Sequence, residues 1–239
     1  MVKFLVVLLG LASLSARAAA QERVARLYAL GGEPGGAPLF TQRIHLEADS
    51  KGRRVQDSTI SDQNGNIVMT EKAILEGSRI VSQDVEQRQV GEAYTLEVKE
   101  NKATYRTFAL QNGKRVPKSA HTSDAPPEFV TGPAVEAFLR ERLGAKLASE
   151  AIAADFGVFE IERSVPFEFR LTGVKEGGKV IKVRLKPANW WISMVVAPID
   201  LELDAKTFEL VRYQGRTPLK RKINGNWKPF DSQILYSPN

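Results

Sequence analysis

The sequence predicts a mainly β protein in which one long antiparallel meander bends into a curved sheet or half-barrel. Apolar residues alternate with charged or polar ones in several stretches, most clearly at positions 44–48, 167–171, 181–186 and 199–204. This period-two alternation is typical of strands with one buried and one solvated face, which occur in antiparallel sheets. Turn dipeptides that accept positive φ separate such runs and predict roughly ten or more strands. The clearest are Asn64-Gly65, Asn112-Gly113, Gly177-Gly178 and Asn224-Gly225.

One stretch, at about residues 132–148, has the helical period instead. Thr131 or Gly132 can cap this helix, and Pro133 suits its first turn. The segment 124–127 before it reads Asp-Ala-Pro-Pro, a stiff linker that cannot pair in a central strand. The apolar residues on one side of the helix are Val135, Phe138, Leu139, Leu143 and Leu147.

These patterns divide the chain into a signal peptide at 1–20 and a single β-rich domain at 21–239. Within the domain we expect a first meander at 21–123, a linker and helix at 124–149, and a second meander at 150–239. Two sub-domains are the alternative. A chain of 239 residues is long enough for either arrangement.

The first twenty residues have the pattern of a secretory signal. A short basic start is followed by a near-continuous apolar stretch from Phe4 to Leu14 and then by small residues. Cleavage after Ala20 fits best, and cleavage after Ala18 is the competing register. The apolar stretch is shorter than a bilayer span requires, and no second one follows, so we expect a periplasmic protein without a membrane-spanning helix.

Composition narrows the function classes. The formal net charge is +6 and falls to +4 once Lys3 and Arg17 are removed with the signal, which is too little for a nucleic-acid-binding protein. The chain has no cysteine, which excludes disulfides and a lipid-anchored N-terminal cysteine. A dense basic run at 216–222 could contact anionic head groups of the envelope, although a solvated loop is the simpler interpretation.

The segment 187–198 does not alternate. It is uncharged, is bounded by Pro187 and Pro198, and holds two of the three tryptophans. We expect a short apolar helical segment at about 189–196 that covers the concave face of the sheet, either as ordinary core or as the lining of an apolar cavity for a lipid-like ligand. The candidate ligand-binding residues are Trp190, Trp191, Met194, Val195 and Phe138.

No residue pattern points to catalysis, a cofactor or a metal. The chain has two histidines, too few for a typical zinc site without cysteine. His45 falls on the polar face of a predicted strand, and His121 falls in a segment that we expect to be a loop. No nucleophile elbow, S-x-x-K motif or phosphate-binding loop is present.

Turns and strand spacing give the chain a family resemblance. The chain resembles a group of uncharacterised Gram-negative periplasmic proteins in the stretches 61–68, 73–77, 204–207, 210–211 and 213–218, and in Asn224-Gly225-Asn226-Trp227 and Ile234-Leu235-Tyr236. That group is similar in fold to the lipoprotein carriers (LolA/LolB-like), which have a curved antiparallel half-barrel closed by helices. The resemblance implies a hydrophobic ligand pocket, while fold analogy alone does not establish function.

Three functions remain, in order of preference. The first is a periplasmic binding or carrier module for an amphipathic molecule such as a lipid or acyl chain. The second is a structural or protein-interaction component of the envelope without a small-molecule site, which a solid core lacking a cavity of roughly 300 Å³ would favour. The third is a hydrolase, for which the sequence nominates no residues.

Overall fold

A computed structural model of the chain describes residues 20–32, 35–145, 151–188 and 197–237. Fifteen strands form one sheet in the order β8-β7-β6-β5-β4-β3-β2-β1-β15-β14-β13-β12-β11-β10-β9. Every neighbouring pair is antiparallel except β9 and β10, which run parallel. The prediction of a mainly β, antiparallel meander is therefore confirmed.

The first half of the sheet is a simple meander, in which each strand pairs with the next. Its turns follow the expected chemistry: Asn112-Gly113, between β7 and β8, takes positive φ at both residues, as a tight hairpin requires. The strands are β1 (Gln21–Ala29), β2 (Phe40–Ala48), β3 (Arg54–Asp62), β4 (Ile67–Glu76), β5 (Arg79–Gln87), β6 (Glu92–Lys99), β7 (Lys102–Gln111) and β8 (Lys114–Asp124).

The second half begins with the short strand β9, and its meander of β10 to β15 follows the helix. Its strands are β9 (Phe129–Val130), β10 (Ile152–Val158), β11 (Arg163–Lys175), β12 (Val180–Pro187), β13 (Ile199–Asp204), β14 (Leu210–Ile223) and β15 (Asn226–Tyr236). The helices are α1 (Val135–Ala145) and the short 3₁₀ turns η1 (Gly132–Ala134), η2 (Phe159–Ile161) and η3 (Glu176–Gly178).

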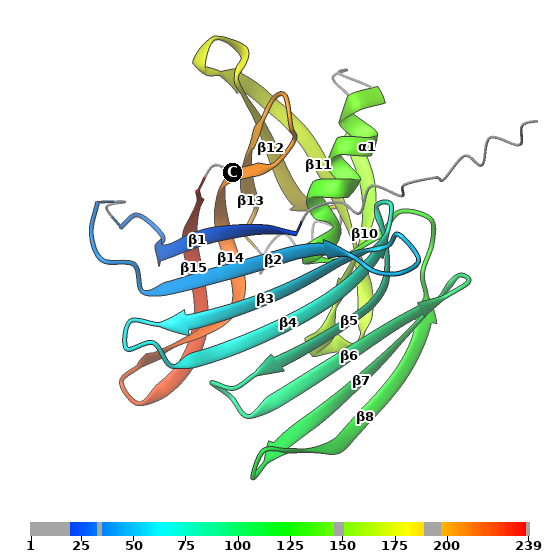
Figure 1. Cartoon of the computed structure of the whole chain (residues 1–239), viewed down its shortest axis with the longest axis vertical. Helices are drawn as coiled ribbons and strands as arrows, with labels where there is room; N and C mark the ends of the chain where they lie inside the picture. Colours follow the sequence, from blue (N-terminus) through cyan, green and yellow to red (C-terminus); the bar gives the residue numbers. More distant parts are fainter. Residues whose placement is uncertain (1–19, 33–34, 146–150, 189–196, 238–239) are drawn as a thin grey trace, which may run out of the picture.

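The two ends of the described chain meet in the middle of the sheet. β1 pairs with β2 on one side and with β15 on the other, with Ala25 opposite Tyr236 and Leu27 opposite Ile234. The outer edges of the sheet are then β8 and β9, which are not paired with each other in the described chain. The sheet bends without closing, so that its two halves face each other across α1 (Figure 1).

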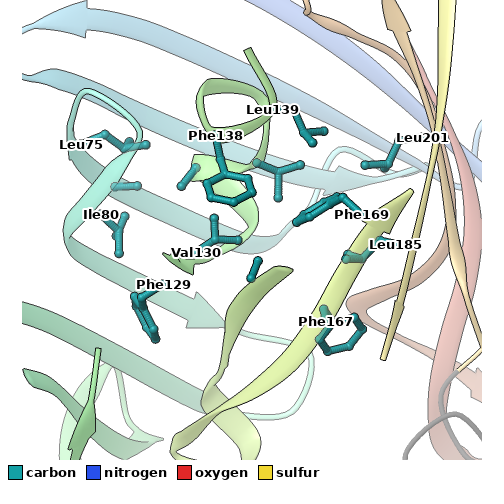
Figure 2. Packing of buried hydrophobic residues seen from close by; sticks show 14 of the residues in the cluster. Leu75, Ile80, Phe129, Val130, Phe138, Leu139, Phe167, Phe169, Leu185 and Leu201 are labelled. Atoms are coloured by element: carbon teal, nitrogen blue, oxygen red, sulfur yellow. The ribbon is translucent and has the colours of Figure 1, made fainter. Parts of the chain in front are cut away.

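Apolar side chains of α1 fill the space between the two halves. Phe138, Leu139 and Leu143 are all almost fully buried, and the ring of Phe138 packs 5.6 Å from that of Phe169 on β11. Leu75 and Ile80 of the first meander belong to the same cluster, as do Phe167, Leu185 and Leu201 of the second (Figure 2). The helix therefore joins both meanders into one core.

The observed helix differs from the predicted one in two respects. It is preceded by the 3₁₀ turn η1, and Thr131 makes no side-chain capping bond, because its side chain is buried instead. The predicted end of the helix, including Leu147, and the predicted segment 189–196 lie outside the described residues. As the flanking prolines predict, β12 ends at Pro187 and β13 begins after Pro198.

The expectation of a loop at His121 is wrong. His121 lies in β8, an edge strand whose side chains are mostly exposed on both faces. A strand without a buried face shows no alternation of apolar and polar residues, which is why its sequence resembles a loop.

A second apolar cluster joins strands of the first meander to β14 and β15. It includes Leu27, Phe40, Leu219 and Phe230, and the rings of Phe40 and Phe230 meet edge to face at 5.5 Å. Three hydrogen bonds of 2.9 Å tie β14 to the turn after β5: Gln87 Nε2 donates to Pro218 O, Gln89 Nε2 donates to Lys220 O, and Lys220 N donates to Gln89 Oε1.

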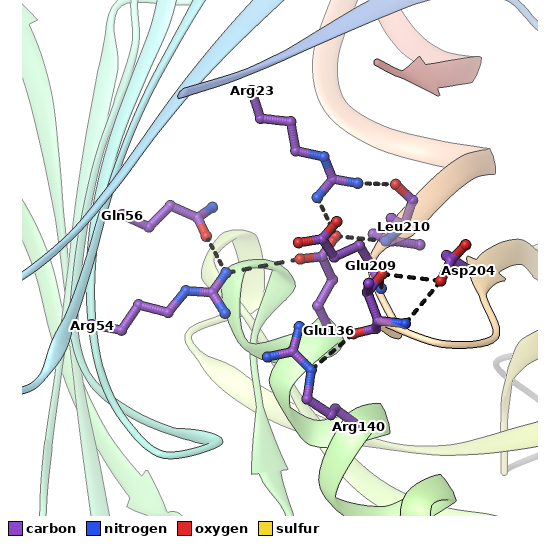
Figure 3. Close-up of polar contacts among 9 residues, drawn as sticks. Arg23, Arg54, Gln56, Glu136, Arg140, Asp204, Glu209 and Leu210 are labelled. Atoms are coloured by element: carbon purple, nitrogen blue, oxygen red, sulfur yellow. Dashed lines mark hydrogen bonds and ion pairs between the residues drawn. The ribbon is translucent and has the colours of Figure 1, made fainter. Parts of the chain in front are cut away.

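A buried ion pair connects the seam between the two meanders to the helix. Arg23 of β1 donates from Nη1 to Glu136 Oε1 of α1 at 2.6 Å, and from Nη2 to the carbonyl of Leu210. The amide of Leu210 donates to the same carboxylate at 2.8 Å (Figure 3). The guanidinium of Arg23 also lies 4.5 Å from the ring centroid of Tyr236. One carboxylate thus joins β1, α1 and β14.

Two further arginines surround this ion pair. Arg54 of β3 lies 3.8 Å from Glu136 and donates to Gln56 at 3.2 Å. Arg140 donates from Nε to the carbonyl of Thr207 at 3.1 Å. Burial, and the nearby positive charges of Arg140 and Arg23, lower the pKa of Arg54 despite the attraction of Glu136. Glu136 is therefore the counterion for a cationic group of side chains.

Replacing Glu136 with glutamine tests this role. The Arg23 and Glu136 side chains are 5 % and 12 % exposed, so loss of the charge leaves a buried guanidinium without its counterion. We expect the free energy of unfolding, measured by urea denaturation, to fall by about 3 kcal/mol. Glu141→Gln, on the exposed side of the same helix, is the control and should change it by less than about 0.5 kcal/mol. Equal effects of the two variants would contradict the assignment.

Candidate functional site

The candidate site is a cavity of about 360 Å³ beside strands β10 and β11, called here the β10–β11 cavity. Its apolar lining comes from Ile152, Ala154, Pro166, Phe167 and Ala188. Strand pairing sets these residues in place: Ala154 lies opposite Phe167, and the amide of Ala188 donates to Pro166 O at 2.9 Å. A volume in this range can hold a small ligand.

Charged side chains stand around this apolar lining. Glu128 and Arg142 lie 3.5 Å apart, and Glu168 is paired with Arg170 at 2.9 Å. Asp155 has no cation within ion-pairing distance among the described residues. Burial and the neighbouring charge of Glu128 raise the pKa of Asp155. The site thus combines an apolar lining with one carboxylate that is not neutralised by the protein.

The predicted ligand-binding residues are only partly placed by the structure. Phe138 does not line the cavity: it is 3 % exposed and belongs to the core, with the guanidinium of Arg142 5.7 Å from its ring centroid. Its contact with the cavity is therefore indirect, through Arg142. Trp190, Trp191, Met194 and Val195 lie outside the described residues, and their role stays a prediction.

A second cavity, of about 330 Å³, lies between β6, β7, β8 and the turn η2. Its polar groups pair with one another: Lys118 donates to Glu92 at 2.7 Å, and Thr107 and Ser119 both donate to Glu162. These bonds lower the pKa values of Glu92 and Glu162, so both are ionised at neutral pH. Two of its three carboxylates are already paired, and the third, Glu160, is exposed to solvent. This cavity is therefore the less favoured ligand site.

Glu162 also has a structural role. It follows η2 with a positive φ of 52°, a conformation that costs a residue with a side chain about 1 kcal/mol or more. Its carboxylate accepts hydrogen bonds from Thr107 on β7 and Ser119 on β8. Side chains, rather than a backbone ladder, thus connect the second meander to the edge strands of the first.

One titratable group stands on the inner face of the sheet. Glu71 of β4 lies opposite Ser58 and Val85, both buried, and accepts a 2.6 Å hydrogen bond from Gln83 Nε2. Burial raises the pKa of Glu71 to about 7, an effect that the Gln83 bond opposes only in part. The inner face of the sheet is therefore not uniformly apolar.

Metal-binding clusters and membrane-spanning helices are absent from the described part of the chain. It contains no group of three or more histidine, cysteine, aspartate or glutamate side chains able to hold a metal ion. It also contains no helix with the length and apolar character needed to cross a membrane.

The chain is similar to three solved structures, all at low identity. A β-barrel-like protein of the domain of unknown function DUF1849 from Brucella abortus is 10% identical, with 90% of this chain and 94% of that chain covered and a TM-score of 0.38. A DUF1329 family protein from Desulfovibrio piger ATCC 29098 is 10% identical, with coverages of 91% and 82% and a TM-score of 0.28.

The third, a porin-like protein from Bacteroides uniformis ATCC 8492, is 11% identical, with coverages of 90% and 96% and a TM-score of 0.24. No family model matches the chain, and no curated protein matches it significantly. At these identities and TM-scores we draw nothing about function from the similar structures. None of the three is described as a lipoprotein carrier, and the predicted resemblance to that fold stays a prediction.

Sequence reasoning placed Phe167 and Glu168 in a strand but did not find the cavity. Ile152 and Ala154 belong to an alternating run, which predicts a strand and nothing more. Glu128 and Asp155 are 27 positions apart and meet only because β9 and β10 run side by side, with Asp155 N donating to Glu128 O at 3.1 Å. No local sequence signal could have paired these two carboxylates.

Glu71 generates a pH prediction. A carboxyl whose pKa is raised by folding stabilises the protein fully below its unfolded value of 4.5, and this contribution is lost as the pH rises toward about 7. Each pKa unit corresponds to about 1.4 kcal/mol. Between pH 4.5 and pH 8 the free energy of unfolding of Glu71→Gln should therefore rise, relative to that of wild type, by on the order of 3 kcal/mol.

Urea denaturation of both proteins across this pH range measures the effect. Glu76→Gln, at the exposed end of the same strand, is the control and should follow the wild-type curve. If the Glu71→Gln and wild-type stability curves run parallel, Glu71 does not titrate in this window.

Proposed function

We propose that the chain is an exported envelope protein that binds an amphipathic, lipid-like ligand in the β10–β11 cavity. The observation that carries the proposal is the chemistry of that cavity. The apolar part of this cavity of about 360 Å³ suits part of an acyl chain, and the charged groups that also line it suit a polar head. The signal pattern of residues 1–20 supports the exported location.

The charges favour one kind of head group. Glu128 is paired with Arg142 and Glu168 with Arg170, which leaves Asp155 as the carboxylate of the cavity that no described cation neutralises. Burial and the neighbouring charge of Glu128 raise the pKa of Asp155. A ligand that donates a hydrogen bond or carries an ammonium group would satisfy it. We therefore expect neutral or cationic amphiphiles to bind more tightly than anionic ones.

Filling the cavity tests the proposal. Ala153 is exposed and lines the cavity, so Ala153→Trp should occupy the space while keeping a residue suited to a strand. We expect binding of the neutral dye N-phenyl-1-naphthylamine, followed by its fluorescence, to weaken by about tenfold, equivalent to about 1.4 kcal/mol. Ala153→Ser, which leaves the space open, is the matched control and should bind as wild type does.

The outcomes separate the two candidate functions. If the intact protein does not bind the dye at micromolar concentration, the ligand-binding proposal is wrong, and the structural or protein-interaction role becomes the better one. The same holds if the dye binds but Ala153→Trp leaves its affinity unchanged, since the dye then occupies another surface. Asp155→Asn adds a second readout: it should abolish the preference for alkylammonium over alkyl sulfate probes.

A further inference from the structure

Exposed apolar side chains gather at one end of the sheet. Large hydrophobic residues scattered singly over a surface are ordinary, but their concentration in one region marks an interaction surface. Most of the large exposed hydrophobics in the described chain lie at, or within three residues of, turns on the same end of the meander. They are Leu30, Ile67, Val116, Ile223 and Trp227.

Strand order explains why these turns lie together. In an antiparallel meander, alternate turns fall at the same end, so the β1–β2, β3–β4, β5–β6 and β7–β8 turns form one row. Because β15 is antiparallel to β1, the β14–β15 turn joins that row. Figure 1 shows the β14–β15 hairpin, drawn orange to red, reaching the edge where the β3–β4 and β5–β6 turns lie.

The tip of that hairpin, residues 220–228, is strongly basic and exposed; it is called here the basic hairpin. It contains Lys220, Arg221, Lys222 and Lys228, and the sequence has no acidic residue between Arg216 and Phe230. Ile223 and Trp227 are 47 % and 45 % exposed, and the ammonium group of Lys222 lies 5.8 Å from the ring centroid of Trp227.

The pairing within the basic hairpin is unfavourable for the isolated protein. Arg221 lies directly opposite Lys228 in the register of β14 and β15, and like charges in that position destabilise a sheet. No described carboxylate is within ion-pairing distance of Lys220, Arg221, Lys222 or Lys228. An anionic surface would relieve this repulsion. The hairpin is also held in position, because Gln89 exchanges two 2.9 Å hydrogen bonds with Lys220 at its base.

We infer that the basic hairpin docks on an anionic lipid bilayer, with Ile223 and Trp227 entering the interfacial region and the four cations contacting lipid head groups. Tryptophan favours the membrane–water interface, and clustered lysine and arginine bind anionic lipid surfaces. A soluble polyanion would match the charge but would give no reason to expose Ile223 and Trp227 at the tip. This inference stands whether or not the β10–β11 cavity binds a ligand.

Vesicle binding tests the inference. The purified protein should bind vesicles of equal parts phosphatidylglycerol and phosphatidylcholine, bind pure phosphatidylcholine vesicles far more weakly, and dissociate as salt shortens the range of the charges. Removing three charges with Arg221→Gln, Lys222→Gln and Lys228→Gln should weaken binding by about a hundredfold, or about fivefold per charge. Residues 1–20 are the same in every variant, so their contribution cancels.

The double variant Trp227→Ala with Ile223→Ser tests the contribution of the apolar side chains to vesicle binding. It should weaken binding while keeping all four charges. A matched control lies in the β11–β12 hairpin at the opposite end of the sheet, where Val174 and Lys179 are also exposed. Val174→Ser with Lys179→Gln should bind vesicles as wild type does. All substituted residues are exposed, and unchanged urea midpoints would confirm that the variants fold.

Three results would overturn the inference. The first is equal vesicle binding by wild type and the triple charge variant. The second is binding to phosphatidylcholine alone that is as tight as binding to the anionic vesicles. The third is binding to heparin that is tighter than vesicle binding and indifferent to the Trp227 and Ile223 substitutions, which would make the hairpin a polyanion site. Blue-shifted tryptophan emission that disappears in Trp227→Phe would support insertion of this residue.

Discussion

The pairing of β1 with β15 is the constraint on which the rest of the structure depends. It joins the two meanders at the middle of the sheet and leaves β8 and β9 as its outer edges. A sheet of this length bends, so its apolar inner faces turn toward each other and must be covered. α1 covers them, and Arg23 on β1 is bonded to Glu136 on that helix, so the seam and the cover are fixed by one carboxylate. The burial of this ion pair makes the arrangement specific rather than merely apolar.

Near the outer edges of the open sheet, side-chain hydrogen bonds connect the two meanders in place of a backbone ladder. Glu162, held in a left-handed conformation after β10, accepts hydrogen bonds from Thr107 and Ser119 on the last two strands of the first meander. β8 itself carries Lys114, Lys118 and a proline, residues that discourage pairing with another chain. Side chains thus connect the two unpaired edges of the sheet, and the two cavities described above lie beside the strands and turns near these edges.

The sequence predicted the parts of the fold that depend on local patterns. Alternation at 167–171 and 181–186 gave strands that the structure confirms, and the helical period gave α1 with Phe138, Leu139 and Leu143 buried. His121 was misplaced because β8 has no buried face and therefore no alternation. The pairing of β1 with β15 and the meeting of Glu128 with Asp155 depend on contacts distant in sequence, which no local pattern reports.

The interior chemistry also bears on where an amphipathic ligand would lie. A chain inserted deep between the two meanders would lie against the Arg23–Glu136 pair and Glu71. It would also have to displace apolar side chains that already pack there, among them Phe138 and Phe169. Opening space in a packed core costs several kcal/mol, more than a few methylene groups return at about 0.8 kcal/mol each. The β10–β11 cavity needs no such displacement. The filled interior therefore favours the β10–β11 cavity over the deep core as the ligand site.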